Sequence, residues 1–119
     1  MEERECVIAL NTVVTVGGRR FADLMRRFGS ACAIIRAKEE ELRQVKGIGT
    51  ETAGRIRTLR DGKALMRELQ KAEKLGVKIA VQDDHSYPAA LLNLAYPPPA
   101  VYIFGEVLPS DAFSIAVVG

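Results

Sequence analysis

Few side chains of this sequence are of the types that perform acid–base or nucleophilic chemistry. His85 is the only histidine, and the two cysteines, Cys6 and Cys32, lack the CxxC spacing of a zinc or redox motif. An acid–base pair or a metal site would need several such groups to converge. The sequence therefore predicts no catalytic residue, no metal site and no cofactor, and it places both thiols, reduced, in apolar packing.

The segment 42–56 fits a different chemistry, the binding of phosphate by backbone amides. Its pattern predicts a helix that ends near Val45, a tight glycine-rich turn, and a second helix that starts near residue 50. The glycines permit positive φ angles and close approach by another chain, and Ile48 fills the space between the helices. The free amides of the turn and of the second helix then form an anion site. The residues expected to bind are Lys46, Gly47, Ile48, Gly49, Thr50 and Arg55, with Arg57 nearby.

A weaker copy of this helix-hairpin-helix pattern lies 31 residues earlier. Its members are Val14, Gly18, Ala22, Met25 and Phe28, in the places of Val45, Gly49, Ala53, Ile56 and Leu59. Val16 replaces the first glycine and Gly17 the apolar plug, so the turn departs from the pattern. Arg19 and Arg20 follow, and they add positive charge to the candidate binding residues. The alternative is a pair of ordinary helical hairpins whose glycines only cap helices.

Composition and charge narrow the possible partners. Hydrophobic residues make up 48% and charged residues 27%, which is typical of a folded globular protein. Residues 1–75 hold 16 Lys and Arg against 11 Asp and Glu, whereas residues 76–119 hold 1 against 4. This difference indicates a polyanion partner for the first part, or else strongly solvated helix faces. No apolar stretch approaches the roughly 20 residues of a membrane helix, and the acidic start lacks a secretion signal, so we expect a cytoplasmic protein without membrane contact.

A change of pattern near Gly76 divides the chain. Before it, apolar stripes at helical spacing predict helices, and Gly76 itself predicts a helix C-cap. The stripes are Phe21, Leu24, Met25 and Phe28, and Leu65, Leu69, Ala72 and Leu75. After it, β-branched runs predict strands at 77–81, 100–104 and 115–118, whose continuous apolar character favours a parallel sheet covered on both faces.

The predicted fold is thus an α+β fragment. It joins an all-α domain with paired hairpins, over residues 1–75, to the truncated start of an α/β domain, over residues 76–119. A parallel sheet needs crossover helices, and none follows the last strand. The alternative is a small independent α+β fold whose short strands pair antiparallel.

The motifs of the second part resemble those of the DprA/Smf family of DNA-processing proteins. In order, they are Asp84-His85-Ser86-Tyr87-Pro88 with Leu91-Leu92, then Pro97-Pro98-Pro99-Ala100-Val101-Tyr102-Ile103-Phe104-Gly105, then Ile115-Ala116-Val117-Val118-Gly119. The resemblance covers nearly the whole chain, and it implies a SAM-like helical domain followed by a Rossmann-like domain. It implies a non-catalytic protein that binds single-stranded DNA, is a homodimer at full length and helps load the RecA recombinase during natural transformation. It also implies that Gly119 opens a DNA-binding loop.

Two other classes of function stay open on the residues alone. An apolar strand that ends in a glycine, as at Gly119, also opens the phosphate loop of Rossmann-type nucleotide-binding enzymes. The hairpins by themselves would suit a generic repair-type module for duplex DNA. Tyr87, Tyr96 and Tyr102 could stack on bases, although packing beside the prolines accounts for them as well.

Overall fold

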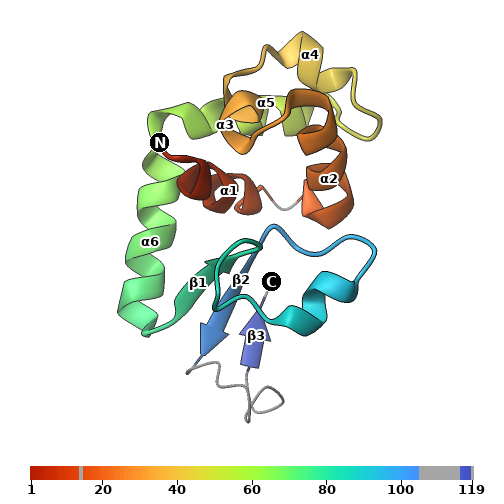
Figure 1. Cartoon of the computed structure of the whole chain (residues 1–119). Coiled ribbons are helices and arrows are strands. Elements are labelled where there is room, and N and C mark those ends of the chain that lie inside the picture. The colour runs from red at the N-terminus through yellow and green to blue at the C-terminus, as the bar shows by residue number, and fades with distance from the viewer. Residues whose placement is uncertain (14, 105–115, 119) are drawn as a thin grey trace.

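The computed structural model describes residues 1–13, 15–104 and 116–118, with side chains up to Phe104. It shows a mixed α+β protein in which helices predominate (Figure 1). The helices are α1 (Glu3–Asn11), α2 (Gly17–Phe28), α3 (Ala31–Arg36), α4 (Glu39–Arg43), α5 (Thr50–Thr58) and α6 (Lys63–Leu75), with the short 3₁₀ helices η1 (Leu59–Asp61) and η2 (Ala89–Asn93). The strands are β1 (Lys78–Val81), β2 (Ala100–Phe104) and β3 (Ala116–Val118). Helices α1 to α5 form one end of the molecule, the sheet forms the other, and α6 runs between them.

The helical part is built on the amphipathic stripes that its sequence predicts. In α2, Phe21 and Leu24 are buried while Met25 and Phe28 pack against the same core, so this stripe is confirmed. The helix stops at Gly29, whose φ of 88° lies in the left-handed region that glycine adopts without strain. Helix α3 packs against both α1 and α2, and it brings the buried faces of these helices into one core.

Helix α6 carries the chain from the helical part to the sheet. Leu65 and Ala72 are buried, and Gly76 ends the helix with a φ of 68°, as the sequence predicts. The stripe also predicts a buried Leu75, and this is wrong: Leu75 is 59% exposed because the last turn of α6 borders an open groove toward Tyr102. Among the residues that the structure describes, no helix is long and apolar enough to cross a bilayer.

The three strands pair antiparallel in the order β1-β2-β3. Val81 of β1 lies opposite Ala100 of β2, and Val118 of β3 lies opposite Tyr102. The predicted strand positions are confirmed over the described residues, whereas the parallel pairing is wrong for these three strands. Antiparallel pairing, the alternative that the sequence left open, is the one observed.

Both faces of the β1–β2 pair are covered, which accounts for the continuous apolar character of these two strands. The residues on the face toward the helices are Ile79, Val81 and Ala100, and they share one core with α1 and α3. Those on the other face are Ala80, Val101 and Ile103. Tyr87 and Leu91, from the segment between β1 and β2, cover this second face. In a parallel sheet, crossover helices would lie in that place. The division at residue 75 stays a prediction, and the core includes residues from both sides of it.

Candidate nucleic-acid interface

The hairpin of segment 42–56 has the order of helix, turn and helix that its sequence predicts. Helix α4 ends at Arg43, and α5 starts at Thr50 after a turn. Ile48 is only 4% exposed and belongs to the same core as Leu42 of α4 and Ile56 of α5, so its predicted place as the plug is confirmed. The exposed residues around it are Lys46, Gly47, Gly49 and Thr50.

The two glycines of this turn have different roles. Gly47 has a φ of 89°, in the left-handed region, whereas Gly49 has a φ of −91°, which any residue adopts. A Cβ at Gly47 would overlap the guanidinium of Arg20, while a Cβ at Gly49 would meet nothing within 4 Å. Gly47 is therefore required by the backbone and by its neighbour. Gly49 leaves open surface at the start of α5, where another chain can approach.

The N-terminus of α5 presents backbone amides suited to an anion. The first intrahelical bond joins the Ala53 amide to the Gly49 carbonyl at 3.0 Å. The amides that precede it on the helix are those of Thr50, Glu51 and Thr52. Glu51 also brings a carboxylate into this first turn, where it forms an ion pair with Arg55 at 2.8 Å. Because this pair offsets the charge of Arg55, phosphate binding here depends on cations from outside α5.

Helix α2 supplies those cations. The guanidinium of Arg20 lies against Gly47, in the space that the missing side chain of the glycine leaves. Asp23, at 3.7 Å from Arg20 in the same helix, orients the guanidinium and offsets part of its charge, so the neighbouring Arg19 and Lys46 add to the positive charge here. Farther along α2, Arg27 donates a hydrogen bond of 2.5 Å to the side chain of Gln44. Through these two arginines α2 contacts the region between α4 and α5, beside which it lies (Figure 1).

The turn between α1 and α2 departs from the hairpin pattern, as its sequence predicts. The positive φ, 57°, falls at Gly17 rather than at position 16, and Val16 is buried at 1% exposure. In the later hairpin the left-handed Gly47 precedes the buried Ile48, whereas here the buried Val16 precedes the left-handed Gly17. A hydrogen bond of 2.8 Å between the hydroxyls of Thr15 and Thr52 connects this turn to α5. Val14 lies outside the described residues.

An exposed aromatic ring adjoins the same side of α2. Tyr96, between η2 and β2, is 48% exposed, and the guanidinium carbon of Arg19 lies 5.9 Å from the centre of its ring. A Cβ at Gly18 would overlap the carbonyl oxygen of Tyr96, so α2 begins directly against this segment. The start of α2 thus contacts Tyr96 through Gly18 and Arg19, and it contacts the turn at Gly47 through Arg20. We call this the α2–hairpin surface; its members are Arg19, Arg20, Arg27, Lys46, Gly47, Gly49, Thr50, Arg55 and Tyr96.

The other two tyrosines are engaged in packing. Tyr87 is 4% exposed and its hydroxyl donates to the Pro98 carbonyl at 2.8 Å, while burial raises the pKa of this hydroxyl. The half-buried Tyr102 donates to the carboxylate of Glu68, and burial together with that carboxylate raises the pKa of Tyr102 far above its usual value. Packing, the simpler of the two interpretations, therefore holds for these two rings, and Tyr96 stays a candidate for base stacking.

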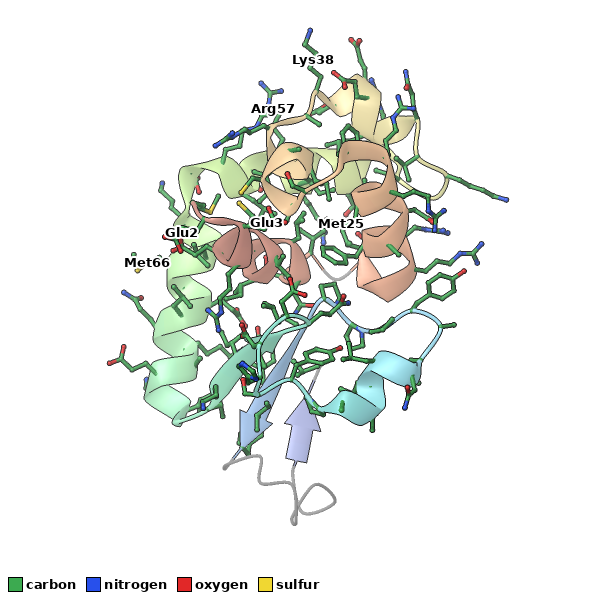
Figure 2. All side chains as sticks on the ribbon, viewed as in Figure 1. Glu2, Glu3, Met25, Lys38, Arg57 and Met66 are labelled. Carbon is green, nitrogen blue, oxygen red and sulfur yellow. The ribbon has the colours of Figure 1, made fainter. Side chains whose placement is uncertain are left out.

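Sequence reasoning missed a second basic area, a depression of about 520 Å³ at the α4 end of the helical part. It is lined by Arg36, Lys38, Arg43, Arg57 and Arg60, together with Glu39 and Glu40. Lys38 and Arg57 project outward there (Figure 2). Arg60 is structural, since it donates to the carbonyls of Ile35 and Ala37 at 2.8 and 2.7 Å. No periodic signal marks this area, because its cations come from different elements.

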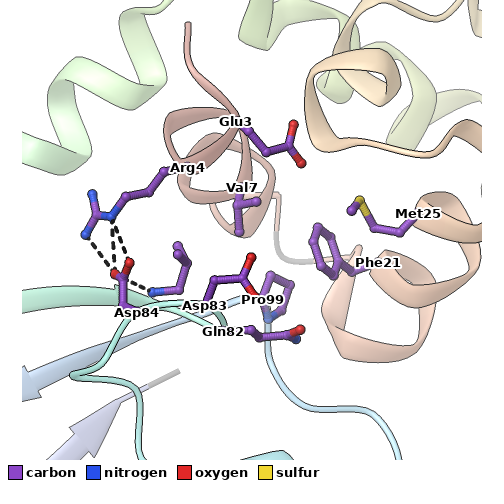
Figure 3. A pocket seen from close by; sticks show the side chains of 10 residues that line it. Glu3, Arg4, Val7, Phe21, Met25, Gln82, Asp83, Asp84 and Pro99 are labelled. Carbon is purple, nitrogen blue, oxygen red and sulfur yellow. Dashed lines mark hydrogen bonds and ion pairs between the residues drawn. The ribbon is translucent and has the colours of Figure 1, made fainter.

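A cleft of about 250 Å³ between α1, α2 and the turn after β1 has a different character (Figure 3). Several of its polar side chains already form hydrogen bonds or ion pairs within the fold. Asp84 pairs with Arg4 at 3.1 Å and accepts from the Val81 amide at 3.1 Å. The carboxylate of Glu3 accepts from the Ala31 amide at 2.7 Å, at the start of α3. These acidic groups disfavour a polyanion; the Asp84 pair connects the turn after β1 to α1, and the Glu3 bond connects α1 to α3. We therefore assign this cleft a structural role.

The requirement for glycine at position 47 can be tested directly. Gly47→Ala should lower the free energy of unfolding by about 1–2 kcal/mol, because a Cβ strains the left-handed backbone, and it should also displace Arg20. Gly54→Ala, inside α5 with no atom within 4 Å of its Cβ position, should instead raise stability by up to about 1 kcal/mol, since alanine favours helices. Urea unfolding of both variants measures the difference. Equal effects would contradict this account of Gly47.

Comparisons of the chain with protein-family models, with curated proteins and with solved structures gave no match. The class that the fold and site define is thus a mixed α+β protein, mostly helical, with a basic surface that carries an exposed aromatic ring. Within the described part of the chain, no group of three or more His, Cys, Asp or Glu side chains could hold a metal ion. Gly119, the predicted start of a DNA-binding loop, lies outside the described residues.

Proposed function

We propose that this chain binds single-stranded DNA through the α2–hairpin surface and acts without catalysis, as part of a DNA-processing protein of the DprA/Smf kind. The observation that carries the proposal is the juxtaposition made by α2, where Arg20 lies on the Gly47 turn and the preceding Arg19 lies on Tyr96. Cations and turn amides suit the phosphate backbone, and an exposed ring suits an unpaired base. Together these groups match a single strand better than a duplex, whose bases are stacked inside.

The antiparallel sheet is compatible with a Rossmann-like domain, because many doubly wound folds carry antiparallel strands at one edge. In this proposal β1 and β2 form such an edge, and Gly119 opens the main DNA-binding loop. A nucleotide-binding enzyme has less support. The antiparallel pairing is the same for both functions, but a dinucleotide would bind at the carboxyl ends of parallel strands and would leave the cations and the exposed ring of the α2–hairpin surface unused.

The wider role follows from the family resemblance. The full-length protein would be a cytoplasmic homodimer that helps load the RecA recombinase onto single-stranded DNA during natural transformation. The charge of the helical part supports a polyanion partner, since residues 1–75 hold 16 Lys and Arg against 11 Asp and Glu. The hairpins would then add sequence-independent phosphate contacts.

Lys46→Ala tests the phosphate contacts. Lys46 is exposed beside the Gly47 turn, so its loss should weaken binding of both a labelled single strand and its duplex about two- to five-fold, as expected for an exposed ion pair. The slope of log affinity against log salt for the single strand should fall by about 0.7. Fluorescence anisotropy titrations at several salt concentrations measure both quantities.

Lys71→Ala is the matched control, because Lys71 is an exposed lysine of α6, and α6 lies on the side of the molecule away from α2 (Figure 1). It should leave the affinity and the salt dependence unchanged. Equal losses in the two lysine variants would indicate non-specific attraction by net charge. Binding by the original chain that prefers the duplex would favour the repair-type module over the proposed function.

A further inference from the structure

Two cysteines that lie 26 positions apart in the sequence are neighbours in the helical part. The Sγ atoms of Cys6 in α1 and Cys32 in α3 are 2.7 Å apart, and both thiols are free. The close packing of α1 on α3 sets this distance, so the two sulfurs are held together by the core rather than by a flexible loop. A disulfide bond joins sulfurs at about 2.05 Å, which requires only a small further approach.

The two thiols differ in their access to solvent. Cys6 is 2% exposed, as apolar packing predicts, whereas Cys32 is only half-buried. Both line a cavity of about 250 Å³, together with Met1, Ile35, Arg36 and Arg60. Because a water molecule occupies about 30 Å³ of liquid, this cavity can admit a small polar oxidant. The Cys32 amide donates to the Glu3 carboxylate at 3.0 Å, which holds the start of α3 beside α1.

The chemistry of the pair assigns different roles to its members. Burial, with the neighbouring thiol of Cys32, raises the pKa of Cys6 to about 12, so this group stays protonated at neutral pH. The accessible Cys32 is therefore the thiol that reacts first with an oxidant. Cys6 is placed to resolve the product, since its sulfur already touches that of Cys32.

We infer that Cys6 and Cys32 form a reversible intramolecular disulfide when the protein meets a hydroperoxide. The Cys32 thiolate attacks one peroxide oxygen, the O–O bond breaks, and Cys32 becomes a sulfenic acid while hydroxide leaves and takes up a proton. The Cys6 sulfur then attacks the Cys32 sulfur, the S–O bond breaks, and the departing hydroxide takes the Cys6 proton as water. The two thiols lose two electrons, and hydrogen peroxide is reduced to two waters. A dithiol reductant reverses the change.

Intact mass measurement after thiol labelling tests the inference. The full chain is treated with hydrogen peroxide, quenched, denatured and labelled with N-ethylmaleimide. We expect a monomer that has lost two hydrogen atoms and takes no label, and that takes two labels after reduction with dithiothreitol. The oxidised protein should also unfold at a higher temperature than the reduced one, because the new bond restricts the unfolded chain.

Two single variants keep the test decisive. Cys32→Ser changes a partly exposed residue, so it should fold; it should keep one labelled thiol after peroxide and show no rise in the unfolding temperature. Cys6→Ala should gain oxygen at Cys32 without losing hydrogen, and if this core variant fails to fold, Cys32→Ser alone decides. Two labels on the peroxide-treated original chain would overturn the inference. Sulfinic acid without a disulfide, or a disulfide between two chains, would do the same.

Discussion

Replacing Ile48 with alanine should lower the free energy of unfolding by about 2–5 kcal/mol, the usual range for removing a large aliphatic side chain from a core. Ile48 is 4% exposed and belongs to the same buried core as Leu42 of α4 and Ile56 of α5, so its removal leaves a cavity in that core. Ile48→Val removes one methyl group and should cost only about 0.5–1.5 kcal/mol. Chemical unfolding followed by circular dichroism measures this series.

The matched control is Met66→Ala on α6, because Met66 is a large apolar residue that is 56% exposed. This substitution should change the free energy of unfolding of the protein by less than about 0.5 kcal/mol. A loss at Ile48 no larger than the loss at Met66 would show that the plug adds little to the packing of the hairpin. A cavity effect predicts a smaller loss of stability for Ile48→Val than for Ile48→Ala, whereas a change of turn conformation does not predict this order.

Replacing Tyr96 with leucine should weaken binding of single-stranded DNA by about 1–3 kcal/mol, the contribution of one base stacked on an aromatic ring. The ring is 48% exposed with Arg19 beside it, and leucine keeps an apolar side chain but offers no π face. Binding of the duplex should change much less, because paired bases are not available to stack. Parallel anisotropy titrations with a single strand and its duplex give the two losses.

Tyr96→Phe provides the control, since phenylalanine keeps the stacking surface and loses only the hydroxyl. This variant should bind the single strand nearly as well as the original chain. If the phenylalanine and leucine variants lost the same affinity, the ring would not be stacking on bases. If neither lost affinity, the aromatic part of the α2–hairpin surface would be removed from the proposed function.

The two paired patterns show how far local sequence reasoning reaches. In the later hairpin, glycine spacing predicts the turn, the plug and the start of α5 near residue 50, and all three are confirmed. These features depend on backbone conformation and on burial within a few residues, which the residue types encode directly. In the earlier copy, the shift of the left-handed residue to Gly17 follows from the two altered positions.

The direction of strand pairing shows where such reasoning fails. Continuous apolar strands indicate a sheet that is buried on both faces, and the structure shows this for β1 and β2. They do not indicate what covers the second face. Here Tyr87 and Leu91 of the segment between β1 and β2 cover it, and β1 and β2 pair antiparallel. The two arrangements leave the same pattern of buried residues along each strand.

The sequence by itself determined the helical stripe of α2, the strand positions, the plug at Ile48 and the concentration of cations before residue 76. Each of these depends on spacing along the chain, which folding does not alter. Only the tertiary structure decided that Arg20 lies on Gly47, that Arg19 lies on Tyr96, and that Cys6 touches Cys32. These contacts join segments far apart in the sequence, and they depend on how helices with similar apolar faces pack into one core.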